Sequence, residues 1–262
     1  MVSAIISSAR DVSPGPSSKV EDTDMQNREN CLSTFSPPCS PLALLESAYE
    51  REIVFSEGVP STNSGVLYPD EIKYIEHAVE KRRAEFGTAR VCARLALSKL
   101  GIPPCALVPR VDRSPQWPPG VVGSISHTEK LCGVAVTTSP RIVSLGLDLE
   151  IDAPLEPDLQ RLICTSAERQ WLDQHRSTER GHAAKILFSA KEAFYKCQYT
   201  VTEQFLEFTD VELSIDLQRG SFFVSGIRRV GAEWDKVRLT TGKICTSHGI
   251  IATLAVLAAA NS

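Results

Sequence analysis

Two carboxylates stand two residues apart in the run Gly146-Leu147-Asp148-Leu149-Glu150. The leucines predict a β-strand, in which residues i and i+2 point to the same side, so we expect Asp148 and Glu150 to lie together. Like charges this close repel one another unless a cation lies between them. Carboxylate oxygens are ligands that Mg²⁺ accepts readily, and Mn²⁺ shares that preference. The pair therefore indicates a divalent metal site; the alternative is an edge strand whose acids face solvent.

A third carboxylate belongs to the run FSAKEAFYK, residues 188–196. Glu192 and Lys196 are four residues apart and share one face of a predicted helix. An ordinary surface ion pair, worth about 0.3–0.5 kcal/mol, explains that spacing equally well. If this helix packs on the acidic strand, Glu192 completes a set of three carboxylates and the lysines can neutralise a phosphate.

Ser126 and His127 are the other candidates for chemistry, at the end of the predicted strand 121–127. Adjacent residues in an extended segment point to opposite sides, which argues against a direct Ser-His nucleophile pair. The chain also has no GxSxG nucleophile elbow and no glycine-rich phosphate loop. A hydrolase built on these two residues is an alternative, and an ordinary polar turn is another.

Three arginines are spaced to share one helical face. Arg83, Arg90 and Arg94 stand at i, i+7 and i+11, with Gly87 between them. A solvated basic face explains this pattern. Arginines beside a glycine are also suited to gripping a phosphate with paired hydrogen bonds.

The elements that must position these residues alternate between helical and extended patterns. A helix is predicted from Asp70, as N-cap, to Leu100, with a break or a close backbone approach at Gly87. Thr165 and Glu168 form a capping box for a further helix, and another helix is predicted over 183–199. Strands are predicted at 53–55, 121–127, 131–137, 142–149, 211–215, 221–225, 237–239 and 250–257. With a boundary at Pro140, the pattern predicts an α+β protein of two halves.

Composition excludes several classes of function. The 262 residues carry a net charge of −4, which gives no reason to expect nucleic-acid binding. No apolar run approaches the roughly 20 residues of a membrane helix, and the N-terminus lacks a signal-peptide pattern. The eight cysteines form no CxxC pair, which favours reduced thiols in a cytoplasmic protein. Residues 1–40 are rich in Ser, Pro and Asp and are predicted to be a disordered extension.

The three motifs together resemble a known family. GSISH (123–127), GLDLE (146–150) and FSAKEAFYK (188–196), in this order and at these separations, resemble the signature motifs of surfactin- and enterobactin-type phosphopantetheinyl transferases. RRAEFGTARVCARLALSKLG (82–101), PQWPPGVVGSISH (115–127) and TSAERQWL (165–172) are similar to the enterobactin-type branch. The resemblance covers roughly 53–258. Phe188 stands where the family often has Trp.

The resemblance implies a pseudo-dimer of two similar α+β halves with the active site in the cleft between them. Residues 41–140 would be the half that binds coenzyme A, and residues 141–262 the catalytic, metal-binding half. The enzyme would move 4'-phosphopantetheine from coenzyme A to a serine of an apo acyl or peptidyl carrier protein and release adenosine 3',5'-bisphosphate. The same resemblance favours siderophore or other secondary metabolism and, with one self-contained cleft, a monomer. Nucleic-acid and membrane partners are not expected, on the composition given above.

Site residues carried over by resemblance fall into three groups. Mg²⁺, or Mn²⁺ in its place, would be held by Asp148, Glu150 and Glu192. Coenzyme A phosphates would meet His127, Ser126, Lys196 and Lys191, and its 3'-phosphate end would meet Arg83, Arg90 and Arg113. The catalytic set would be Glu192, Lys196 and His127, with the serine proton passing to Glu192 directly or through a metal-bound water.

Two further expectations depend on the same resemblance. Lys185 and Arg180 are candidates to meet an acidic carrier helix. A non-catalytic coenzyme A-binding protein of the same fold is the alternative function, and the intact set of Asp148, Glu150, Glu192 and Lys196 argues against it.

Overall fold

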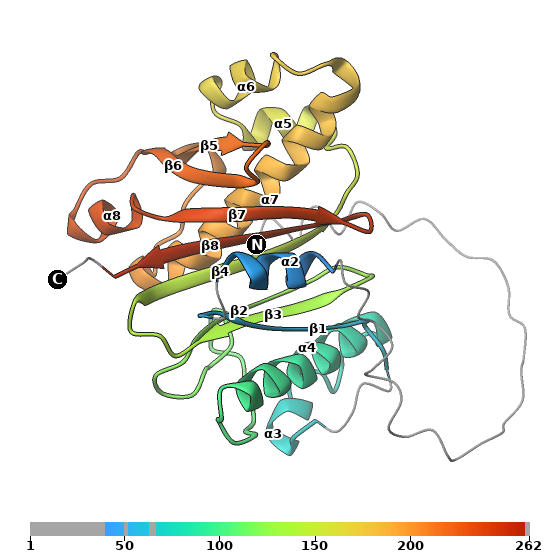
Figure 1. The fold of residues 1–262 in the computed structure, drawn as a ribbon. Helices are drawn as coiled ribbons and strands as arrows, with labels where there is room; N and C mark the ends of the chain where they lie inside the picture. Colours follow the sequence, from blue (N-terminus) through green and yellow to red (C-terminus); the bar gives the residue numbers. More distant parts are fainter. Residues whose placement is uncertain (1–39, 50–51, 63–66, 260–262) are drawn as a thin grey trace, which may run out of the picture. The chain divides into compact units, whose positions relative to one another are not determined.

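Helices and strands are mixed in the computed structural model, which describes residues 40–49, 52–62 and 67–259. The described residues belong to one compact unit, Phe35–Ser262. They form a three-stranded sheet, order β1-β3-β2, and a five-stranded sheet, order β4-β8-β7-β6-β5 (Figure 1). The prediction of an α+β fold is confirmed. The predicted disordered extension lies outside the described residues, except for Ser40.

The smaller sheet is antiparallel and consists of β1 (Val54–Gly58), β2 (Val122–His127) and β3 (Cys132–Thr137). Helix α4 (Glu80–Lys99) lies along one face of it (Figure 1). The small side chains of Cys92, Ala93 and Ala96 on α4 pack against Val134 and Val136 of β3. These small residues allow the helix to approach the sheet closely, and burial of this apolar surface fixes their relative position.

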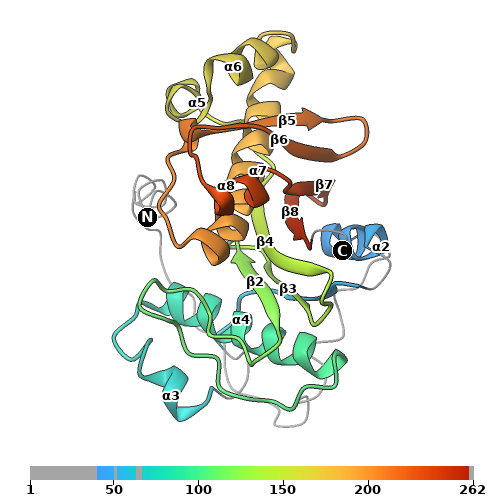
Figure 2. The same ribbon diagram turned by 90° about the vertical axis from the view of Figure 1, so that its left-hand side faces the viewer.

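The larger sheet is also antiparallel. Its strands are β4 (Ile142–Ile151), β5 (Val211–Asp216), β6 (Ser221–Ile227), β7 (Thr241–Ser247) and β8 (Ile250–Ala258). Helix α7 (Ser177–Thr202) packs along β4 and β8 (Figure 2). Strand β8 is buried along most of its length, as expected for a strand with partners on both edges and covered faces.

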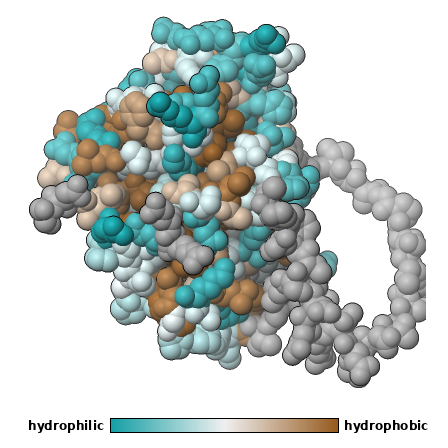
Figure 3. Space-filling view, in the orientation of Figure 1, coloured by the Kyte–Doolittle hydropathy of each residue, from teal (hydrophilic) through white to brown (hydrophobic). Residues whose placement is uncertain are grey.

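Short helices pack against the sheets and against α7. Helix α2 (Pro41–Ala48) contacts β1, β7 and β8 and buries two leucines. Helices α5 (Pro157–Ile163), α6 (Ser166–Leu172) and the 3₁₀ helix η2 (Phe208–Asp210) lie beside α7 and β5. The end that carries α5 and α6 is mostly hydrophilic (Figure 3). No helix in the described ranges is both long and apolar enough to cross a membrane.

The edge strands of the two sheets meet through serine side chains. Ser124 Oγ of β2 accepts a hydrogen bond from the Leu147 amide of β4 at 2.9 Å, and Ser126 Oγ accepts one from the Leu149 amide at 3.1 Å. Both pairs are spaced by two residues, as strands require. Buried amide groups need acceptors, and here hydroxyl groups take the place of a neighbouring strand's carbonyls. We call these two contacts the serine junction.

Several predicted boundaries differ from the structure. The helix predicted from Asp70 to Leu100 is two helices: α3 (Pro69–Ile72), with Tyr68 as N-cap, and α4, which begins at Glu80. The predicted break at Gly87 is wrong, because this glycine lies buried inside a continuous helix. The chain breaks earlier, over 73–79, where turns replace helix.

The C-terminal half contains one wrong element. The structure has no strand at 237–239. Val237 is the last residue of helix α8 (Ala232–Val237), in which Trp234 and Val237 are three residues apart and both buried. The strand lies later, as β7, where polar residues such as Lys243 and Thr246 obscure the apolar alternation. The capping box is confirmed, since Thr165 Oγ1 accepts from the Glu168 amide at 3.2 Å and Glu168 Oε2 accepts from the Thr165 amide at 2.7 Å.

Gly146 provides a test of the packing between β4 and α7. A Cβ atom at this position would lie 2.0 Å from the Ala193 carbonyl oxygen and 2.6 Å from the Cys197 amide nitrogen. We expect Gly146→Ala to lower the free energy of unfolding by about 2–3 kcal/mol, because the helix backbone must move away from the strand. Urea denaturation measures this change.

The matched control is Gly226→Ala on β6, where the nearest atom, Glu212 Cβ, lies at an ordinary 3.6 Å. Equal losses in the two variants would contradict the close approach of α7 to β4.

Candidate active site

Asp148 lies at the centre of a buried polar group on β4. Its Oδ1 atom accepts from Lys196 Nζ at 2.7 Å and from Ser126 Oγ at 3.3 Å, and its Oδ2 atom accepts from Ser189 Oγ at 2.9 Å. Lys196 Nζ also donates to the Leu147 carbonyl at 2.9 Å. Strand β2, strand β4 and helix α7 therefore converge on one carboxylate, beside the serine junction.

Two acidic residues that follow Asp148, Glu150 on β4 and Asp152 just after its end, also contact α7. Glu150 Oε2 accepts from Lys185 Nζ, and Asp152 Oδ1 lies 2.9 Å from His182 Nδ1. Burial raises the pKa of Glu150, and the nearby Asp148 charge raises it further, while Lys185 opposes both. Asp148, Glu150 and Asp152 thus form a row of carboxylates, two on β4 and one just after it, each beside a basic side chain.

Glu192 contributes the third predicted carboxylate, from α7. Burial, followed by the charge of Asp148, raises its pKa to about 7, while Lys196 acts in the opposite direction and Glu150 adds to the increase. The three carboxylates are thus close enough to influence one another's ionisation. Their mutual repulsion in a buried site favours a bound cation.

The chemistry of this donor set fits Mg²⁺, which prefers carboxylate oxygens. In the described part of the chain, however, no three His, Cys, Asp or Glu side chains stand close enough together to hold a metal ion as placed. The ammonium groups of Lys185 and Lys196 instead neutralise Glu150 and Asp148. The three carboxylates are therefore of the chemical type that Mg²⁺ binds, and two of them, Asp148 and Glu150, are paired with lysines in this structure.

His127 lies at the end of β2, close to α4. Arg82 Nη1 lies 3.2 Å from His127 Nε2, and because a guanidinium can only donate, this nitrogen accepts and the neutral ring carries its proton on Nδ1. Nδ1 is 3.6 Å from Glu85 Oε2. Burial lowers the pKa of His127 to about 4, and the charge of Arg82 contributes in the same direction.

Ser126 and His127 do not act as a pair. The Ser126 hydroxyl contacts Asp148, Lys196 and the Leu149 amide. The imidazole contacts Arg82 and Glu85 instead. This geometry gives no support to a hydrolase that uses Ser126 as a nucleophile activated by His127.

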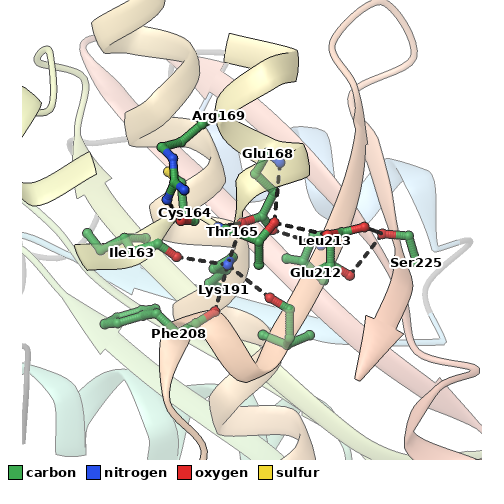
Figure 4. Close-up of polar contacts among 11 residues, drawn as sticks. Ile163, Cys164, Thr165, Glu168, Arg169, Lys191, Phe208, Glu212, Leu213 and Ser225 are labelled. Atoms are coloured by element: carbon green, nitrogen blue, oxygen red, sulfur yellow. Dashed lines mark hydrogen bonds and ion pairs between the residues drawn. The ribbon is translucent and has the colours of Figure 1, made fainter. Parts of the chain in front are cut away.

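Lys191 makes no contact with Asp148 or Glu150 among those that the structure gives for its ammonium. It lies with Ile163, Glu168, Phe208 and Val211 in what we call the Lys191 cluster (Figure 4). Its Nζ contacts the Glu168 carboxylate at 2.7 Å and donates to the carbonyls of Ile163, Phe208 and Val211 at 2.7–3.0 Å. Its side chain is fully buried. The prediction that Lys191 binds coenzyme A is therefore corrected: this ammonium joins α5, α6, η2 and β5 to α7.

The arginines of the predicted phosphate face have separate roles. Arg90 is buried, donates from Nε to the Leu107 carbonyl at 2.6 Å and lies over the Phe86 ring, and burial lowers its pKa to about 10. Arg94 pairs with Glu71 at 2.9 Å. The structure thus places both in internal packing rather than on a solvated basic face.

Arg83 and Arg113 remain exposed. Arg83 donates to the carbonyls of Ala78 and Glu76 at the start of α4, beside a hollow of about 410 Å³. Arg113 lies in a turn, with φ 71°, and its amide donates to the Arg110 carbonyl. Neither side chain is brought to the three carboxylates by a contact in the described ranges.

Two expected carrier-binding residues have other partners. Lys185 is buried and pairs with Glu150, while Arg180 pairs with Asp173 and donates to Gln160 Oε1 at 3.3 Å. Both side chains therefore already have partners within the protein, and their contact with a carrier stays a prediction.

Sequence reasoning missed a polar stripe on α7. Lys185, Ser189, Glu192 and Lys196 stand at i, i+4, i+7 and i+11, which places them on one helical face. The first two reach Glu150 and Asp148 respectively. The helical spacing of Lys185 and Ser189 from Glu192 is the signal that could have identified them. Lys191 falls outside this series, which agrees with its position in the Lys191 cluster.

Comparisons with known proteins agree on one family. A model described as the 4'-phosphopantetheinyl transferase N-terminal domain matches residues 70–137, and one described as the 4'-phosphopantetheinyl transferase superfamily matches residues 144–244. The chain is 35% identical over 227 residues to the 4'-phosphopantetheinyl transferase Svp of Streptomyces mobaraensis, which covers 83% of this chain and 89% of the relative.

Two other relatives extend this comparison. The 4'-phosphopantetheinyl transferase PptT of Mycobacterium tuberculosis is 35% identical over 195 residues, 72% of this chain and 85% of the relative. Enterobactin synthase component D of Escherichia coli K12 is 32% identical over 145 residues, 53% of this chain and 65% of the relative. The match to PptT again spans most of this chain and most of the relative.

The Lys191 cluster predicts a large loss of stability in Lys191→Met. The change leaves the Glu168 carboxylate buried without its cation, and we expect the free energy of unfolding to fall by about 3–5 kcal/mol in urea denaturation. The control is Lys236→Met, which removes the same charge from an exposed position on α8. The double variant Lys191→Met/Glu168→Gln should recover part of the loss; similar stabilities for Lys191→Met and the control would exclude this role.

The environment of His127 predicts a neutral imidazole at pH 7. Histidine NMR should give a titration midpoint of about 4, below the ordinary 6.5. Since the unfolded chain binds the proton more tightly, the His127 contribution to stability is complete above pH 6.5 and is lost as the pH falls towards 4. Arg82→Ala should raise the midpoint. A wild-type midpoint near 6.5 would show that His127 is solvated.

Proposed function

Since this chain belongs to the 4'-phosphopantetheinyl transferase superfamily, we propose that it moves 4'-phosphopantetheine from coenzyme A onto a serine of an apo acyl or peptidyl carrier protein. It is an enzyme, a 4'-phosphopantetheinyl transferase like its relatives. The observation that supports the finer proposal is the buried Asp148 carboxylate, which Lys196 and Ser126 contact where the two sheets join.

The transfer balances as a substitution at phosphorus. The serine oxygen of the carrier bonds to the phosphorus that bears pantetheine, and the bond from that phosphorus to the bridging pyrophosphate oxygen breaks. Adenosine 3',5'-bisphosphate leaves with the bonding electron pair, and the serine proton passes to a base. Such reactions need positioning and neutralisation of charge more than covalent help from the protein.

The carboxylates are the proposed metal ligands and one is the proposed base. Asp148, Glu150 and Glu192 would hold Mg²⁺, with Mn²⁺ as a substitute; when bound, the ion neutralises negative charge on the pyrophosphate. Glu192 takes the serine proton, directly or through a water. Burial raises the pKa of this carboxyl to about 7 in the metal-free protein, whereas a bound Mg²⁺ would lower its basicity, so the direct route and the water route both stay in the proposal.

Lys196 and His127 are proposed to bind phosphate oxygens. The Lys196 ammonium, held 3.1 Å from Ser126 Oγ, lies at the serine junction and would stabilise the departing bisphosphate. Neutral His127 offers its Nδ1 proton as a hydrogen-bond donor, and Ser126 contributes its hydroxyl. Removing the charge of Lys196 would therefore weaken both coenzyme A binding and departure of the leaving group.

The two halves have distinct proposed roles. Residues 41–140 would bind coenzyme A and residues 141–262 would supply the metal ligands, with the cleft of a pseudo-dimer between them. The packing of α4 on one sheet and of α7 on the other supports this division. Arg83 and Arg113 remain the proposed contacts of the 3'-phosphate, because both are exposed; Arg90 is a weaker candidate, since Leu107 and Phe86 occupy its guanidinium.

The cellular setting is part of the proposal. We place the enzyme in the cytoplasm as a monomer. None of the cysteines in the described ranges forms a disulfide, as expected for a reducing compartment. Similarity to relatives named enterobactin synthase component D favours a carrier protein of siderophore or other secondary metabolism.

The direct test is to incubate the protein with Mg²⁺, coenzyme A and an apo carrier protein, and to weigh the carrier by intact mass spectrometry. We expect the carrier to gain one phosphopantetheine. Asp148→Asn, which keeps the shape but removes the charge, should reduce the rate at least about 100-fold, because a metal ligand and the partner of Lys196 are lost together. EDTA should abolish the gain.

Asp158→Asn is the matched control, since Asp158 is exposed on α5 and its loss should leave the rate unchanged. If several unrelated carriers gain no mass although coenzyme A binds, the proposed transfer is wrong. If Asp148→Asn is as fast as the control, the transfer stands and the proposed metal site is wrong.

A further inference from the structure

Lys185 is placed to control access of a cation to Glu150. We infer that it is a positioning residue of the metal site: its ammonium holds the Glu150 carboxylate in the metal-free protein, and a divalent cation must compete with it for that carboxylate. The inference rests on the proposed function, because it takes Glu150 as a metal ligand.

The contacts of Lys185 are those of a buried ion pair. Its Nζ donates to Glu150 Oε2, and the side chains of Lys185 and Glu150 are only 11% and 22% exposed. The same Nζ lies 5.0 Å from the centre of the Phe188 ring. A charge-assisted hydrogen bond in such surroundings is stronger than one in water, so the carboxylate is held in a fixed orientation.

The neighbouring carboxylates already have basic partners, so Glu150 needs a cation of its own. Asp148 is neutralised by Lys196 at 2.7 Å, and Asp152 faces His182. Without Lys185, the Glu150 carboxylate would carry an unneutralised charge two residues from the Asp148 carboxylate. The lysine therefore stabilises the site before a metal ion arrives.

The same ammonium opposes a metal ion. It occupies one Glu150 oxygen and repels any second cation nearby. With Asp148, Glu150 and Glu192 ionised, the five groups including Lys185 and Lys196 carry a net charge of −1. A divalent ion changes this to +1, and the negative pyrophosphate of coenzyme A then restores the balance. Lys185 should thus make tight metal binding depend on coenzyme A.

The test measures Mn²⁺ binding directly, without activity, by the electron paramagnetic resonance signal of free Mn²⁺ in a titration. In the absence of coenzyme A, Lys185→Met should lower the Kd for Mn²⁺ about threefold or more, because a competing charge is removed. Coenzyme A should strengthen Mn²⁺ binding to the wild-type protein by a larger factor than it does in the variant.

Lys185→Arg keeps the charge and should bind Mn²⁺ like the wild type. Lys236→Met, which removes an exposed lysine from α8, should also leave the Kd unchanged. If the wild type binds Mn²⁺ and Lys185→Met binds it equally or more weakly, the inference is overturned while the metal site stands. If the wild type binds no Mn²⁺ with or without coenzyme A, the metal site itself is wrong and the inference falls with it.

A measurement on the unaltered protein covers the case in which Lys185→Met does not fold. Lysine side chains are labelled with nitrogen-15, and the Lys185 resonance is assigned by its loss in Lys185→Arg. Adding Mg²⁺ and coenzyme A should shift the Lys185 signal, because the contact of Lys185 with Glu150 is disturbed. The Lys191 signal should not move. An unmoved Lys185 signal in a protein that binds Mg²⁺ would overturn the inference.

Discussion

The serine junction is the contact on which the arrangement of the active site depends. Two sheets end in edge strands, and an edge amide that is buried without an acceptor is costly. Ser124 and Ser126 supply the acceptors for Leu147 and Leu149, so β2 is held in one register against β4. This register places the Ser126 hydroxyl beside the Asp148 carboxylate. The same two hydrogen bonds thus join the sheets and assemble the polar site.

Helix α7 connects this site to the rest of the larger sheet through two of its faces. One face carries the stripe of Lys185, Ser189, Glu192 and Lys196 towards β4. Another face carries Lys191, whose buried ammonium binds carbonyls and a carboxylate from elements that follow and precede the helix. Two lysines of one short motif therefore have different roles. Lys196 pairs with the Asp148 carboxylate, and Lys191 holds α7 against the neighbouring elements.

Charge compensation is the second constraint on the site. Burying carboxylates without cations is expensive, and the structure meets that cost with one basic partner for each of the two acidic residues of β4. The partners on Asp148 and Glu150 are lysines, which are flexible single charges that can shift when another cation or a phosphate arrives. Such pairing stabilises the carboxylates in the metal-free protein and is compatible with the proposed binding of a metal ion together with a negatively charged substrate.

The sequence by itself determined most of the elements and the chemical types of the site. The alternation of Leu147, Asp148, Leu149 and Glu150 predicted their strand, the capping box predicted the start of α6, and the motifs indicated the family. These are local signals, because hydrophobic period, caps and short motifs are read within a few residues.

Only the tertiary structure decided which of several lysines and arginines meets the carboxylates. Lys191 and Lys196 are in the same motif, yet the rotation of α7 sends one to Glu168 and the other to Asp148. Arg90, which the spacing placed on a solvated face, became internal because Leu107 and Phe86 cover it. Such outcomes depend on burial between elements far apart in the chain, and local spacing carries no information about the surface against which a helix packs.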